Sequence, residues 1–98
     1  DHTHHSVFIE EPGDFNKILR GVYGRAIVKI DCGGCENHLR PHHLGNLEPG
    51  SILLLKTHGE KIESKILPKL LATGFRIGKT ITIDKEESVE LYTMIYDW

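Results

Sequence analysis

The chain has 98 residues, of which 39% are hydrophobic and 27% are charged. This size and composition predict one globular domain over residues 1–98, and they exclude a disordered or membrane protein. The formal net charge of −2 at pH 7 gives little electrostatic reason to bind nucleic acid or an anionic membrane, so neither partner is expected. No apolar run approaches the roughly 20 residues of a transmembrane helix, and we expect no signal peptide.

The first third of the chain predicts a strand, a helix and a second strand. Residues 6–11 (SVFIEE) have strand composition and stop at the turn pair Pro12-Gly13. Asp14 stands where a helix N-cap is expected, and apolar residues then repeat at helical spacing. These residues are Phe15, Ile18, Leu19 and Val22, followed by Gly24. Residues 25–31 (RAIVKID) are apolar on both sides, which is typical of a central strand.

The rest of the chain predicts further alternation and a final hairpin. Residues 36–47 predict a short kinked helix or a partly ordered loop, because Pro41 and Gly45 interrupt any long helix. Residues 51–57 (SILLLKT) predict a strand, and residues 60–73 a helix in which Pro68 predicts a kink or a start near Ser64. Leu54 and Leu70 are expected in one core. Residues 76–84 and 89–96 predict two strands. The last of them is apolar on both faces, which indicates burial on both sides or a subunit contact.

The predicted order is β-α-β-α-β-α-β-β. It indicates an α/β or α+β fold with a small mixed sheet of about five strands and two to three helices. The histidine-rich residues 1–5, which hold His2, His4 and His5, are expected to be a disordered terminus. His58, beside Gly59, is expected to be a turn residue without a functional role.

The only two cysteines, Cys32 and Cys35, form a CxxC motif directly after the strand 25–31. Two thiols at this spacing can close a disulfide, bind a soft metal or carry a persulfide. A thiol at a helix N-terminus has a lowered pKa, and Gly33 and Gly34 leave the backbone free to turn. A CxxC in this context is typical of a reducing compartment, so we expect a cytoplasmic protein. The alternative is that the two cysteines are incidental core residues.

The arrangement resembles the thioredoxin-like family. The matching stretches are residues 28–35 (VKIDCGGC), Pro41 shortly beyond them, and residues 74–89 (GFRIGKTITIDKEESV), which look like the closing strand pair of that family. This resemblance implies that Cys32 is the attacking thiolate and Cys35 the resolving thiol. It also implies that the partner is a protein thiol or disulfide.

Two further resemblances keep other chemistries open. Residues 27–39 (IVKIDCGGCENHL) are similar to the metal-binding segment of heavy-metal-associated domains, and the layout from Leu47 onward is similar to that of sulfur-relay carriers. Histidines near the CxxC favour a metal site there, because two thiolates and two imidazoles suit tetrahedral zinc. The candidate ligands are Cys32, Cys35, His38, His42 and His43.

The leading hypothesis is thiol-disulfide exchange or sulfur handling at Cys32 and Cys35, with no certain cofactor. Its first alternative is binding or trafficking of zinc or copper between a metal donor and an acceptor. The second alternative is a non-catalytic structural or dimerising domain. The sequence leaves the substrate, the metal and the formation of a homodimer open.

Overall fold

The computed structural model of the chain describes residues 5–97. Its strands are β1 (His5–Ile9), β2 (Ala26–Ile30), β3 (Ile52–His58), β4 (Phe75–Asp84) and β5 (Val89–Tyr96). Its α-helices are α1 (Asp14–Lys17) and α2 (Glu60–Thr73), and its 3-10 helices are η1 (Leu19–Gly21), η2 (Cys35–His38) and η3 (Pro41–Leu44). The described part of the chain therefore has the predicted α+β architecture.

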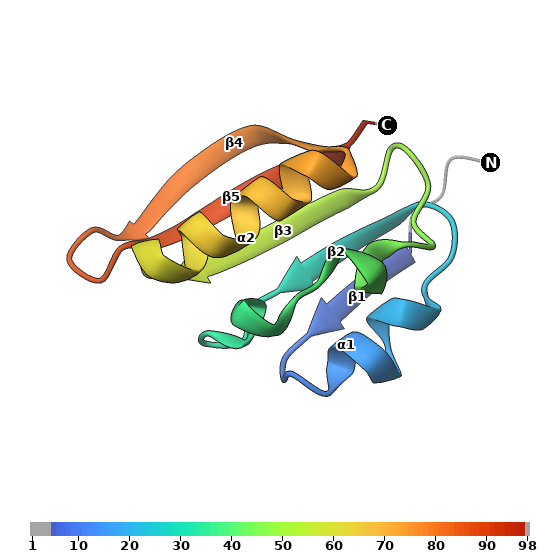
Figure 1. Ribbon diagram of the computed structural model, residues 1–98, viewed down its shortest axis with the longest axis horizontal. Coiled ribbons are helices and arrows are strands. Elements are labelled where there is room, and N and C mark those ends of the chain that lie inside the picture. The colour runs from blue at the N-terminus through green and yellow to red at the C-terminus, as the bar shows by residue number, and fades with distance from the viewer. Residues whose placement is uncertain (1–4, 98) are drawn as a thin grey trace.

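The strands form one mixed sheet in the order β1-β2-β3-β5-β4. β1, β2 and β3 are parallel, whereas β5 runs antiparallel to β3 and to β4. The carboxyl ends of the three parallel strands consequently meet at one end of the sheet, at the left of Figure 1. The loop after β2, which holds the CxxC motif, lies at this end.

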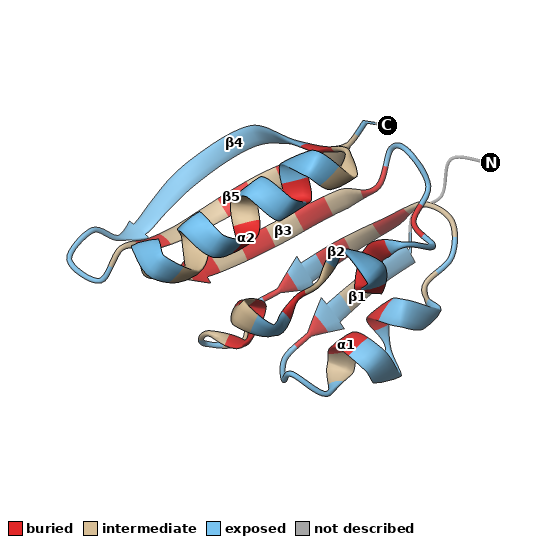
Figure 2. Cartoon of the chain, in the orientation of Figure 1, coloured by how far each residue is buried: buried red, intermediate tan, exposed pale blue. Residues whose placement is uncertain are grey.

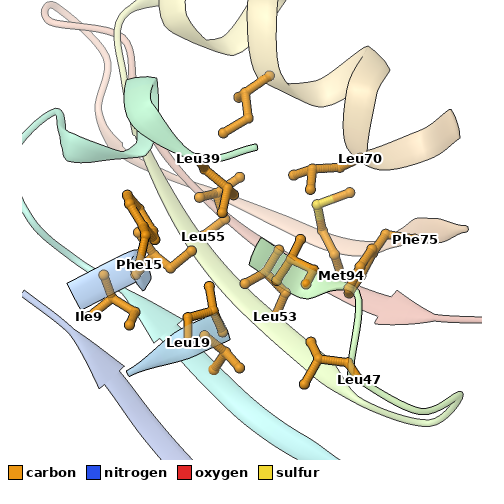
Figure 3. Packing of buried hydrophobic residues seen from close by; sticks show 14 of the residues in the cluster. Ile9, Phe15, Leu19, Leu39, Leu47, Leu53, Leu55, Leu70, Phe75 and Met94 are labelled. Atoms are coloured by element: carbon orange, nitrogen blue, oxygen red, sulfur yellow. The ribbon is translucent and has the colours of Figure 1, made fainter. Parts of the chain in front are cut away.

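The helices cover one face of the sheet, and the core lies between the two layers (Figures 1 and 2). Leu53 lies opposite Met94 and Leu55 opposite Tyr92 in the register of β3 and β5, and all four are buried. Figure 3 shows side chains from the helices and from the sheet meeting in this layer. Leu54 alternates to the opposite face and is only partly buried, so the expectation that it belongs to the core is wrong.

The helical segment predicted after Asp14 is shorter than its apolar pattern indicates. α1 ends at Lys17 and the chain continues as the 3-10 helix η1, while Ile18 between them is 41% exposed. Phe15 and Leu19 fill the interior from this segment, with exposures of 1% and 0%, and the partly buried Val22 packs against the core. Ile18 is β-branched, and Gly21 stands three residues after it. Both residue types disfavour a continued α-helix, which explains the early end.

The segment 36–47 is two 3-10 helices instead of one kinked helix. Arg40, between η2 and η3, has extended backbone angles (φ −128°, ψ 152°), and Pro41 is the first residue of η3. The proline ring disfavours helical angles in the residue before it and lacks the N–H that a continuing helix needs. Pro41 therefore sets the break that its position predicts.

α2 has the predicted bounds and runs through Pro68 from a start at Glu60, not from Ser64. Gly74 ends it in the left-handed conformation (φ 115°), where its N–H donates to the Leu70 carbonyl. None of the helices within residues 5–97 is long and apolar enough to cross a membrane. Of the predicted disordered terminus, residues 1–4 lie outside the described residues, whereas His5 begins β1.

Candidate functional site

The CxxC loop begins where β2 ends, and its first residue, Asp31, contacts both neighbouring strands. The Asp31 N–H donates to the Ile9 carbonyl at 3.2 Å. The Asp31 carboxylate lies 3.5 Å from Lys56 Nζ on β3, with both side chains partly exposed. The loop thus leaves the sheet from a fixed point next to β1 and β3.

Cys32 and Cys35 are joined in a disulfide, with their Cα atoms 5.3 Å apart. The Cys35 N–H points back to the Cys32 carbonyl at 3.4 Å, which closes the turn. Cys35 is 4% exposed and belongs to the core cluster, whereas Cys32 is only partly buried at its margin. The two cysteines therefore differ in accessibility, and Cys32 is the more exposed of them.

The two glycines between the cysteines adopt angles that other residues rarely take. Gly33 has φ 58° and Gly34 has φ 115°. A Cβ placed on either glycine would meet no protein atom within 4 Å beyond its chain neighbours. Glycine is needed here for backbone conformation and not for lack of room, and the loop is open to an approaching molecule.

Glu36, the residue after Cys35, lies wholly inside the protein. Its Oε2 accepts a hydrogen bond from the His58 backbone N–H at 2.7 Å and lies 3.1 Å from His58 Nδ1. The Glu36 side chain is 0% exposed, whereas that of His58 is 27% exposed. This pair connects the turn that holds Cys35 to the carboxyl end of β3.

Two buried oxygens close to this connection lack a hydrogen-bond partner among the described residues. They are Glu36 Oε1 and Thr57 Oγ1. Buried polar atoms are nearly always paired, and exceptions concentrate where a protein has a use for them. Two buried oxygens without a partner within residues 5–97 thus lie at the connection between η2 and the end of β3.

Side-chain hydrogen bonds also connect η2 to α2 and to Arg40, which follows η2 in the chain. Lys65 Nζ donates to Asn37 Oδ1 at 3.0 Å, and Arg40 Nη1 donates to the carbonyls of Asn37 and Leu39. Leu39 itself is buried at 1% exposure. Cys35 consequently stands on a turn that is fixed from two sides.

The predicted role of a helix N-terminus at the cysteines needs correction. η2 begins at Cys35 and contains only four residues in 3-10 geometry. The partial charge at a helix N-terminus comes from aligned peptide dipoles, and a single turn aligns few of them. Accessibility, not a helix dipole, distinguishes the two cysteines.

Two histidines of the predicted metal site, His42 and His43, lie together with ring centroids 4.2 Å apart, but their surroundings differ. The His43 ring is buried, stacks on Phe15 with ring centroids 5.3 Å apart, and accepts a hydrogen bond from the Arg40 N–H at Nδ1. Burial lowers the pKa of His43, and the neighbouring cations His42 and Arg40 lower it further. His38 and His42 are exposed.

The five predicted metal ligands are not gathered into one ligand set. Within residues 5–97, no three side chains of histidine, cysteine, aspartate or glutamate lie close enough together to hold a metal ion. The disulfide moreover engages both sulfurs that a metal would need as thiolates. The zinc or copper hypothesis stays a prediction without support from this arrangement.

Sequence reasoning missed Glu36 and misjudged His58, which lies at the end of β3 and contacts Glu36. One signal in the sequence points to Glu36: it stands three residues before Leu39, on the helical spacing of the apolar residues in this segment. A glutamate on a buried face needs a partner, but the sequence does not indicate which element supplies it.

Fold and site together define a small α+β domain that carries a disulfide at the carboxyl ends of its parallel strands. A comparison of this chain with protein-family models, curated proteins and solved structures finds no match. The thioredoxin-like, heavy-metal-associated and sulfur-relay resemblances therefore stay predictions.

Proposed function

We propose that the protein carries out thiol-disulfide exchange through Cys32 and Cys35. The observation that carries this proposal is the unequal exposure of the two linked cysteines, with Cys35 at 4% and Cys32 partly exposed at an open glycine loop. Exchange requires an accessible sulfur for the partner and a second sulfur close behind it. The Cys32–Cys35 pair meets both requirements.

The exchange proceeds in two displacements. In the reduced protein the Cys32 thiolate attacks one sulfur of a partner disulfide, so that a mixed disulfide forms and the other partner sulfur leaves as a thiolate. The Cys35 thiolate then attacks Cys32 Sγ, which closes the Cys32–Cys35 bond and releases the second partner thiolate. The two leaving thiolates take up the two protons that the cysteine thiols lose, and two electrons pass to the partner.

A purely structural role for the bond is less favourable on physical grounds. A disulfide stabilises a fold mainly by shortening the unfolded chain's loops, and a loop closed across four residues contributes only about 2 kcal/mol in that model. The turn that holds Cys35 already has its own fastening through Glu36 to β3 and through Asn37 to α2. These contacts hold the turn independently of the disulfide, which supports a chemical role for the bond.

Glu36 acts as a positioning residue in this proposal. Its carboxyl group ties the second residue of η2 to the backbone of His58, and this holds the adjacent Cys35 in the core. A resolving sulfur that stays in place shortens the lifetime of the mixed disulfide, because the second displacement is intramolecular.

The midpoint potential of the cysteine pair tests the proposal. We would equilibrate the protein in glutathione buffers of graded potential and measure the oxidised fraction by mass spectrometry after acid quenching. Exchange-active pairs have potentials of roughly −270 to −120 mV, whereas structural disulfides lie below about −300 mV. A midpoint within the first range is expected, and a pair that stays oxidised at about −300 mV would overturn the proposal.

Two single variants provide a matched control. Cys35→Ser keeps the accessible sulfur and removes the resolving one, so it is expected to accumulate a mixed disulfide with glutathione at Cys32. Cys32→Ser leaves the buried sulfur, and it is expected to accumulate far less of the adduct. Equal adduct levels in the two variants would contradict the assigned order of attack.

A further inference from the structure

β4 is an edge strand of the sheet, and nearly all of it is exposed. It pairs with β5 alone among the strands of residues 5–97, and only Phe75 of its ten residues is buried. Figure 2 shows this strand as a continuous pale blue band. An edge strand presents unpaired backbone N–H and C=O groups to any strand that approaches it.

Exposed isoleucines lie on both faces of this edge. Ile77, opposite Met94, is on the face that the helices cover, and it remains 41% exposed. Ile81, opposite Leu91, is on the other face and is 42% exposed. Ile83 is 51% exposed. These three isoleucines expose apolar surface that a neighbouring strand would bury.

The charges on β4 are separated along its length. Arg76 and Lys79 lie in its first half, and Asp84 ends it. Antiparallel pairing of two copies of this strand places the cationic half of each beside the anionic end of the other, whereas parallel pairing places like charges together. The charge pattern thus favours one partner and one orientation, namely the same strand running the opposite way.

We propose that β4 pairs antiparallel with β4 of a second copy of this chain, centred on Thr80. In this register Arg76 lies opposite Asp84 of the partner, and Ile77 opposite Ile83. A register centred on Lys79 would place two ammonium groups against each other, which disfavours it.

The symmetry of the pairing agrees with the faces of the strand. A two-fold axis perpendicular to the sheet places the same face of both copies on the same side. Residues that lie opposite each other across the axis must therefore belong to the same face. Arg76 is opposite Ile95 and Asp84 is opposite Val89, and both pairs lie on the face away from the helices. The Arg76–Asp84 contact therefore forms twice in the dimer, once at each end of the paired strands.

A cysteine cross-link tests the register. Thr80 meets its own copy on the axis, so Thr80→Cys is expected to give a covalent dimer on mild oxidation, with residue 80 linked to residue 80 in the peptide map. Thr82→Cys is the matched control, because residue 82 lies opposite Gly78 and has no thiol to meet. Linkage through residue 82 as efficient as through residue 80 would overturn the register.

A charge exchange tests the contact between Arg76 and Asp84. Within one chain the two residues lie opposite Ile95 and Val89, which stand six positions apart on β5, roughly 20 Å, so they cannot meet. By sedimentation equilibrium up to about 1 mM the unchanged protein is expected to approach twice its mass of 11.1 kDa. Arg76→Glu is expected to weaken association about tenfold, and Arg76→Glu with Asp84→Lys to restore it.

The double variant also controls for the intrachain partner of Arg76. The Arg76 Nε donates to Asp97 at 2.9 Å, and Arg76→Glu loses this contact in the single and the double variant alike. Recovery of association in the double variant therefore reports only the contact between copies. A constant monomer mass for the unchanged protein, or no recovery in the double variant, would overturn the proposal.

Discussion

The carboxyl group of Glu36 is wholly buried and accepts a hydrogen bond from the backbone N–H of His58 at 2.7 Å. This contact joins a residue adjacent to the disulfide with the last residue of β3, across 22 positions of sequence. The contact fixes the turn that holds Cys35 to the carboxyl end of β3.

Glu36→Ala is expected to lower the free energy of unfolding by about 2 to 4 kcal/mol. The change leaves the His58 N–H without its acceptor and opens a cavity in the interior. Glu36→Gln keeps an acceptor oxygen at the same place, so it is expected to cost less than Glu36→Ala. The measurement is urea unfolding followed by circular dichroism.

The exposed Glu11 provides the control for this pair, because Glu11→Ala is expected to change stability by no more than about 0.5 kcal/mol. A Glu36→Ala variant as stable as Glu11→Ala would show that the buried contact contributes nothing to the fold.

After reduction, Cys32 is expected to react with iodoacetamide several times faster than Cys35. The reason is steric, because Cys35 is 4% exposed and the Cys32 side chain lies at the margin of the core. Quenched time points and peptide mass mapping give the two rates in one sample. The same experiment in about 6 M guanidinium chloride should bring the rates together. A folded protein in which Cys35 reacts first would reverse the assigned roles.

Leu55→Ala is expected to cost about 2 to 5 kcal/mol, because Leu55 is 0% exposed between the sheet and the helices. Leu54→Ala, one residue away on the uncovered face, is expected to cost clearly less. Chemical denaturation of the two variants measures the difference in the free energy of unfolding. Both variants replace a leucine of the same strand, so they differ only in the face on which the leucine lies. Equal costs would mean that the uncovered face is buried in solution, for instance against another molecule.

His43 is expected to make the protein less stable as the pH falls below 6.5. Burial lowers the pKa of His43 in the folded protein below the value of 6.5 that it regains on unfolding, so the unfolded chain binds the proton more readily. Its contribution to stability is therefore complete above pH 6.5 and is lost as the pH falls through 6.5 toward the lowered folded pKa.

His43→Asn keeps an acceptor for the Arg40 N–H and does not titrate, so it is expected to reduce this loss between pH 7 and pH 5. Thermal unfolding of both proteins across that range measures the difference, and the histidines that do not contact residue 43 contribute equally to both proteins. Parallel stability curves for the two proteins would exclude His43 as the source.

Local patterns in the sequence were sufficient for the longest elements. The apolar spacing of residues 60–73, together with Gly74 as a left-handed terminator, predicts α2 with its observed bounds. The alternation of residues 89–96 predicts a strand, and β5 has these bounds. Both predictions succeed because periodicity and capping depend on neighbours in the chain.

Tertiary structure decided what depends on residues far apart in sequence. Leu54 and Leu55 are equally apolar, and only the placement of the helices on one face of the sheet separates a partly exposed residue from a buried one. Pairing of β3 with β5 leaves β4 at the edge, and this pairing joins strands that are far apart in sequence. The CxxC spacing by itself identified the candidate cysteines. Their unequal exposure, and the contact of Glu36 with His58, arise only when the parallel strands bring their carboxyl ends together, because burial is a property of the packed chain and not of its local sequence.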